Sequence, residues 1–96
     1  MTDEAFQSGA EQARADIAAG RLRLHYELHG DWGQDLQNTL RTRFGVEIIE
    51  LTYFTSGQKR SFQAGYDAVV TAHIDGIFGA GAVSAAYKEV QARRKK

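Results

Sequence analysis

A helix-length segment lies between two strand-like segments, and this order constrains the fold more than any other feature of the chain. In RLRLHYELH, residues 21–29, apolar side chains alternate with polar or charged ones, as in a strand with one face on a core. VEIIELTYFT, residues 46–55, is rich in β-branched and aromatic residues and predicts a second strand with two partly apolar faces. The pattern allows a β-bulge between Ile48 and Ile49. Because about a dozen helical residues connect the two strands, we expect them to be parallel neighbours.

Glycines mark the ends of the predicted helices, since the chain contains no proline. Helical spacing of apolar residues predicts helices over residues 3–19 and 32–44. A longer helix follows, and Gly79 and Gly81 should separate it from a last helix. The inward face of the longer helix should carry Phe62, Tyr66, Val69, Val70, His73, Ile74 and Ile77. A stripe of small residues on this helix would let another helix approach closely: Gly65, Ala68, Ala72 and Gly76.

The predicted fold class is α/β, at the border with α+β, with the element order α-β-α-β-α-α. A chain of 96 residues is long enough for one domain, which we expect over residues 1–92, followed by a basic tail over residues 93–96. Two parallel strands make a thin sheet, so helices must cover it or a second copy must extend it to four strands. The unpaired edge of the second strand favours a homodimer.

Composition excludes several classes of function. The 12 Lys and Arg balance the 12 Asp and Glu, and the basic excess of the second half lies in the last four residues. The body is therefore mildly acidic, which argues against a dedicated nucleic-acid-binding protein. No apolar run approaches the roughly 18 residues of a membrane span. The chain has no cysteine and hence no disulfide or thiolate site, which fits the cytoplasmic location that we expect.

The carboxyl ends of the two predicted strands form the first candidate site. Ligands of open α/β sheets bind beyond these ends, where the following helices present free backbone N–H groups to an anion. The alternative is a turn followed by a helix cap, in which Asp31 would take up the donors of its own helix. Neither nucleotide-binding fingerprint is present. The candidate ligand-binding residues are His29, Trp32, Ser56, Gly57, Lys59 and Arg60.

The first predicted strand carries a candidate metal site. His25, Glu27 and His29 alternate along it and should point to one face, and such residues are typical ligands of zinc or iron. Arg21 and Arg23 share this face, so the alternative is the solvent-exposed side of a half-buried strand. His73 should be a packed core histidine.

The sequence favours a small protein-interaction or regulatory module that acts as a homodimer, with no assigned catalytic residue and no cofactor. Its expected partners are a second copy of itself and another protein, and neither membranes nor nucleic acids. Two alternatives remain open. One is a binder of a small anionic ligand, or an enzyme acting on it, at the strand ends. The other is a metal-binding protein that uses the first strand.

Overall fold

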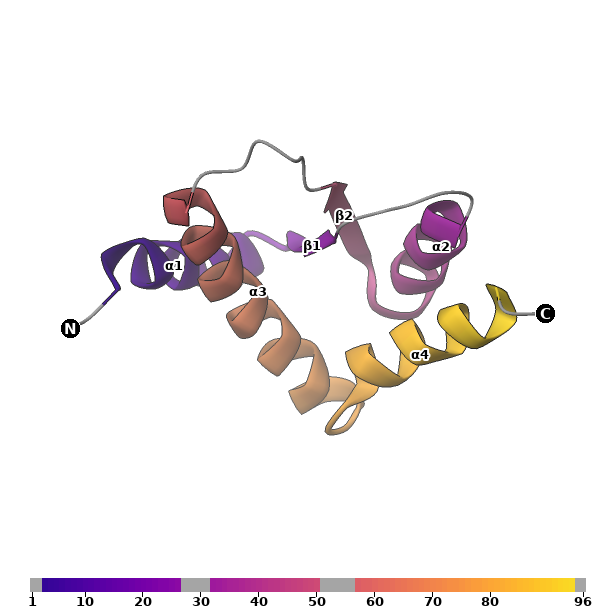
Figure 1. Cartoon of the computed structure of the whole chain (residues 1–96). Helices are drawn as coiled ribbons and strands as arrows, with labels where there is room; N and C mark the ends of the chain where they lie inside the picture. The colour runs from indigo at the N-terminus through magenta and orange to yellow at the C-terminus, as the bar shows by residue number, and fades with distance from the viewer. Residues whose placement is uncertain (1–2, 27–31, 51–56, 95–96) are drawn as a thin grey trace.

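The computed structural model describes residues 3–26, 32–50 and 57–94, in which four helices surround a two-stranded sheet (Figure 1). This confirms the predicted α/β class and the order α-β-α-β-α-α. The elements are α1 (Glu4–Ala18), β1 (Leu22–Tyr26), α2 (Trp32–Phe44), β2 (Val46–Glu50), α3 (Gly57–Phe78) and α4 (Ala82–Arg94).

The two strands are parallel, as predicted, and pair in a continuous register from Leu22 opposite Val46 to Tyr26 opposite Glu50. The bulge that the pattern allowed between Ile48 and Ile49 does not form, because each residue of β2 has one partner on β1. Gly45, with φ of 70°, adopts a backbone conformation that other residues rarely take and lets α2 turn directly into β2. Arg21 precedes β1, and residues 27–29 and 51–55 of the predicted strands lie outside the described residues.

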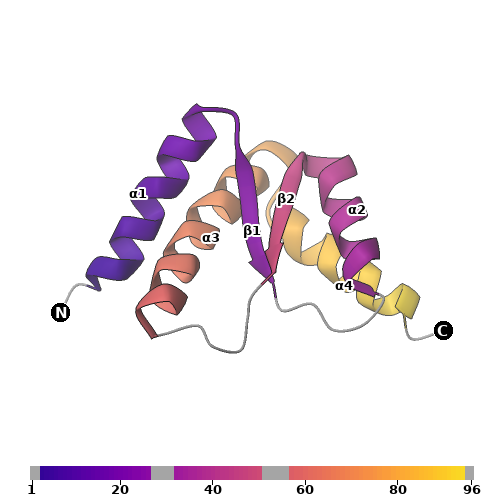
Figure 2. The ribbon, with the colours of Figure 1, turned by 90° about the horizontal axis from the view of Figure 1, so that it is seen from above.

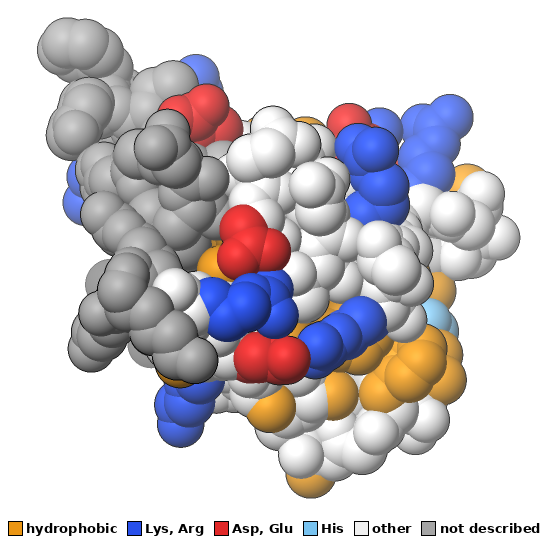
Figure 3. Space-filling view, turned by 90° about the vertical axis from the view of Figure 1, so that its right-hand side faces the viewer, with side chains coloured by type: hydrophobic (Ala, Val, Ile, Leu, Met, Phe, Trp, Pro, Cys, Tyr) orange, Lys and Arg blue, Asp and Glu red, His pale blue; other side chains and the backbone are white. Residues whose placement is uncertain are grey.

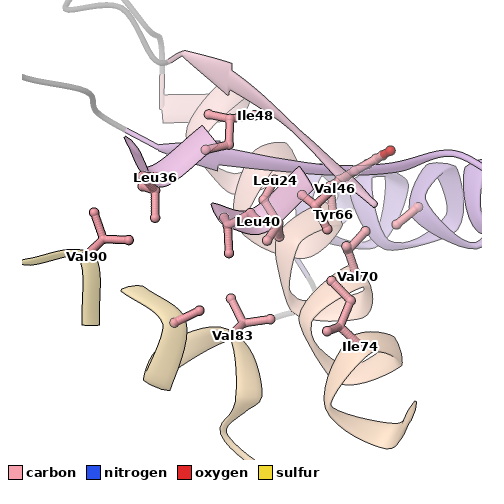
Figure 4. Close-up of a cluster of buried hydrophobic side chains, with 12 residues drawn as sticks. Leu24, Leu36, Leu40, Val46, Ile48, Tyr66, Val70, Ile74, Val83 and Val90 are labelled. Carbon is pink, nitrogen blue, oxygen red and sulfur yellow. The ribbon is translucent and has the colours of Figure 1, made fainter. Parts of the chain in front are cut away.

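The hydrophobic core lies between the sheet and α2, α3 and α4 (Figure 4). Alternate strand residues face it, so that Leu24 of β1 and Val46 of β2 are almost fully buried. Seen from above, α1 and α3 lie on the β1 side of the molecule, and α2 lies on the β2 side (Figure 2). The helices contribute the other buried side chains, among them Leu36, Leu40, Tyr66, Val70, Ile74, Val83, Ala86 and Val90.

Helices α1 and α3 cross at two glycines with almost no space between their backbones. A Cβ atom on Gly65 would lie 1.9 Å from the carbonyl oxygen of Phe6, and one on Gly9 would lie 1.9 Å from that of Phe62. The predicted close approach at the small-residue stripe is thus confirmed at Gly65. The other three members of the stripe are exposed, so the crossing uses only one end of it.

The last helix continues through the predicted boundary at residue 92 and ends at Arg94. Among the described residues, no single helix is long and apolar enough to cross a membrane. Only α3 and α4 taken together meet the length and composition criteria, and these two helices meet at a bend of 94°.

Candidate functional site

A polar cluster joins β1 to α3. It contains His25, one of the three residues of the predicted metal site. Nδ1 of His25 lies 2.7 Å from Oδ1 of Asp67, and only 12 % of the His25 side chain is exposed. The expectation that His25 faces solvent was therefore wrong. Strand β1 has no strand partner on its outer edge among the residues described, and α3 packs there and covers the imidazole.

Asp67 holds His25 at two points. Besides the contact with the ring, both carboxylate oxygens lie 3.2 Å from the backbone nitrogen of His25, whose N–H they accept. The imidazole also stands edge-on to the ring of Tyr66, with 5.5 Å between the centroids. Because a carboxylate only accepts hydrogen bonds, Nδ1 carries the proton of this contact, and Nε2 is the ring nitrogen left for other chemistry.

A second buried pair extends the cluster to α1. The hydroxyl of Tyr66 donates to Oδ2 of Asp16 at 2.5 Å, and the side-chain amide of Gln12 donates to Oδ1 at 2.9 Å. The Tyr66 hydroxyl is the main cause that lowers the pKa of Asp16, because a donor stabilises the ionised carboxylate. Burial, followed by the Asp16 carboxylate, raises the pKa of Tyr66. Three elements, α1, α3 and β1, therefore meet at linked polar contacts.

Tyr26, the last residue of β1, follows His25 and links the strand to α4. Its ring stacks on that of Tyr87 from α4, with 5.6 Å between the centroids. Burial, with a smaller contribution from the Asp67 carboxylate, raises the pKa of Tyr26 to about 12. The phenol is thus neutral across the physiological range and serves packing.

Charged side chains connect α2 to α4 on the opposite side of the molecule. Arg93 donates to both carboxylate oxygens of Asp35 at 3.2 and 2.9 Å, and Arg43 lies 2.6 Å from Glu89. Figure 3 shows acidic and basic groups next to one another on this face. The first residue of the predicted basic tail is therefore paired with α2. All four side chains are nearly half exposed, so we assign this network to the surface rather than to a site.

An apolar surface lies where α3 turns into α4. Ile77 is 63 % exposed and Phe78 is 53 % exposed, although helical spacing had placed Ile77 on the inward face. Phe78 packs edge-on against the half-buried Phe44 of α2, with 5.0 Å between the ring centroids. Figure 3 shows hydrophobic side chains gathered on the lower part of the face, the level of the α3–α4 turn in Figure 1. We call Phe44, Ile77 and Phe78 the apolar corner.

The anion site predicted at the strand ends stays a prediction, because only three of its six residues have described side chains. Gly57, Lys59 and Arg60 are exposed in the first turn of α3. Trp32 opens α2, where the structure does not describe its side chain, and His29 and Ser56 lie outside the described residues. Figures 1 and 2 place the starts of α2 and α3 on opposite sides of the strand pair.

Of the predicted metal set, Glu27 and His29 also lie outside the described residues. No three acidic or histidine side chains in residues 3–26, 32–50 and 57–94 gather closely enough to hold a metal ion. His73, predicted to be a core histidine, is half-buried on α3.

No protein-family model, curated protein or solved structure matches the chain. Function is therefore inferred from the geometry of the polar cluster and of the apolar corner.

Sequence reasoning missed Asp16, Tyr66 and Asp67 as members of one polar cluster. Asp16 did carry a signal, because it falls three residues after Ala13 and beside Ile17, on the apolar side of its helix. A carboxylate at such a position needs a buried donor. The sequence offers many possible donors and does not indicate which one reaches Asp16. The donor is Tyr66, which lies 50 positions further along the chain.

Proposed function

We propose that the protein is an interaction module that pairs with a second copy of itself through the apolar corner. The observation that carries this proposal is the exposure of Ile77 and Phe78, which are neighbours in sequence and project from one end of α3. Large apolar side chains that cluster on a surface, rather than lie scattered over it, are typical of contact sites.

The charge of the corner favours a second copy as the partner. A twofold contact brings the same surface of both copies together, so a charged side chain near the axis would be repelled by the same side chain of the other copy. Residues 76–82, which form the end of α3 and the turn, contain no charged side chain. The outer edge of β2 is less suitable for pairing, since the exposed Glu47 and Glu50 act as the charged residues that commonly protect strand edges.

The size of the corner indicates a weak, concentration-dependent dimer. A fully exposed large apolar side chain presents on the order of 200 Å², so Ile77 and Phe78 together expose roughly that area. A stable interface buries about 800 Å² on each partner. The corner would then form the centre of a contact completed by polar neighbours, and association should require micromolar concentrations or higher.

Light scattering on size-exclusion peaks over a dilution series tests the proposal. The wild-type mass should rise with concentration from 10.6 kDa toward twice that value. Ile77→Lys should hold the mass at 10.6 kDa, because it places two like charges across the twofold contact. Phe6→Lys is the matched control, because Phe6 is also a large exposed apolar residue, at 40 %, but lies on α1. A monomeric wild type at every concentration, or a dimer that survives Ile77→Lys, would refute the proposal.

A further inference from the structure

We propose that His25 is also a nucleophile, whose Nε2 attacks the carbonyl carbon of a small activated acyl ester. This activity belongs to the polar cluster and is independent of pairing through the apolar corner. The proposal stands on the two-point hold of Asp67, whose carboxylate lies 2.7 Å from Nδ1 of His25 and 3.2 Å from the backbone nitrogen of His25. The free electron pair of the neutral imidazole is then confined to Nε2.

The ring is fixed in direction as well as in protonation. Tyr66 packs edge-on against it, and the hydroxyl of this tyrosine is itself held by the buried Asp16. An imidazole that is bonded at Nδ1 and packed on one side loses little further freedom when Nε2 meets a reactant, which is the advantage of a positioned group over free imidazole. In the described part of the chain, no hydrogen-bond partner occupies Nε2.

Asp67 also stabilises the charge that the reaction creates. When Nε2 bonds to carbon, the imidazole becomes a cation, and the carboxylate next to Nδ1 neutralises it. Asp67 does not touch the reactant and is therefore a positioning residue for His25.

The charges around the ring favour a neutral acyl ester over a phosphoryl donor. The carboxylate of Asp67 contacts the ring at 2.7 Å, and Asp16 adds a second carboxylate to the cluster through the hydroxyl of Tyr66. The one arginine on β1, Arg23, acts on Asp16 and lies 3.8 Å from Glu47. A dianionic donor would have to approach these carboxylates, whereas a neutral ester does not. Since only 12 % of the His25 side chain is exposed, a small acyl group suits the site.

The electrons and atoms of the step balance without a further reagent. The Nε2 electron pair forms the N–C bond, and the C–O bond to the leaving group breaks as the leaving oxygen takes its electron pair. The acyl-imidazolium then loses the Nδ1 proton toward Asp67 and solvent. Water attacks the acyl carbon, the N–C bond breaks, and a carboxylic acid and the free histidine are released.

The experiment uses p-nitrophenyl acetate as the probe and follows the release of p-nitrophenolate. Wild-type protein should release it at least about tenfold faster than His25→Asn. In that variant the amide N–H can still donate to Asp67, so the fold is kept while Nε2 is removed. His73→Asn is the matched control and should react like wild type. Intact-mass analysis of rapidly quenched samples should find one acetyl group, on His25.

Two further variants separate chemistry from folding. Asp67→Asn should slow the release even where its thermal midpoint is preserved, and Asp67→Glu should restore part of the rate. After the rate of imidazole alone is subtracted, added imidazole should raise the activity of His25→Ala but not that of wild type. Equal rates for wild type and folded His25→Asn, or acetylation at another histidine, would overturn the proposal.

Discussion

Replacing Gly65 with alanine should destabilise the protein, although the same change elsewhere on a helix normally stabilises it. A glycine inside a helix costs about 1 kcal/mol relative to alanine, so propensity alone predicts a gain. At Gly65, however, the new Cβ would lie 1.9 Å from the carbonyl oxygen of Phe6 and 2.7 Å from its carbonyl carbon. Both atoms belong to the backbone of α1, so no side chain can rotate to relieve the contact.

The size of the effect follows from the distance that α1 must move. Ordinary Cβ contacts begin at 3.4 Å, so the helices would have to separate by about 1.5 Å at the crossing. Overpacking of this kind costs about 1–3 kcal/mol. Because the atoms are rigid, we expect Gly65→Ala to lower the free energy of unfolding by about 2 kcal/mol after the gain in propensity. A domain of this size has a total stability of about 5–14 kcal/mol and should remain folded.

Urea unfolding followed by far-UV circular dichroism measures this difference. Gly76→Ala is the matched control on the same helix, because a Cβ there meets nothing within 4 Å, and it should be neutral or stabilising by up to about 1 kcal/mol. Gly9→Ala should be as harmful as Gly65→Ala, and the double variant should cost less than the two single costs combined, because one displacement of α1 relieves both contacts. A Gly65→Ala protein as stable as wild type would refute the reasoning.

Three further predictions concern titration and surface charge. The pKa of Asp16 is lowered in the folded protein, so its ionised form stabilises the fold above pH 3.8, and this stabilisation is lost as the pH falls below that value. In urea titrations at several pH values, Asp16→Asn should lose less stability at acid pH than wild type does. The pKa of Tyr26 is raised from 10.0 to about 12, so the stability that it contributes is complete below pH 10 and should be lost as the pH rises to about 12. Tyr26→Phe should reduce the alkaline decline in the same assay and leave the part due to Tyr66, whose pKa is also raised. Arg93→Ala should change the urea midpoint less than Gly65→Ala does, because the pair of Arg93 with Asp35 is nearly half exposed. The difference between Arg93→Ala and wild type should vanish in high salt.

The order, class and pairing of the elements could be predicted because they depend on local patterns. The alternation in residues 21–29 and the helical spacing in residues 32–44 each report which side of an element faces a core. A helix between two strands then leaves parallel pairing as the natural arrangement, and the register from Leu22 to Tyr26 confirms it. The glycines that were expected to end α1, α2 and α3 do so, each with a positive φ.

The partners of polar side chains could not be predicted in the same way, because they are set by the packing of distant elements. His25 was expected to face solvent with its neighbours on the strand, and Asp67 carried no signal that it would cover that strand's edge. The two residues are 42 positions apart in the chain. Ile77 was misplaced for a related reason. The helical spacing of apolar residues continues to the end of α3, but the core ends before the last turn, where Ile77 and Phe78 are exposed.

The geometry of α3 explains why a single-face interpretation of this helix was incomplete. Successive residues of a helix are turned by about 100°, so three consecutive side chains point in three directions. Gly65 meets the backbone of α1, Tyr66 enters the core, and Asp67 holds the edge of β1. A helix that is packed on several sides does not show one clean apolar stripe, and its small and polar residues belong to interfaces as much as its apolar residues do. Gly65, which the sequence placed on a stripe for close approach, and Asp67, which carried no signal, therefore fix the position of α3 against its neighbours.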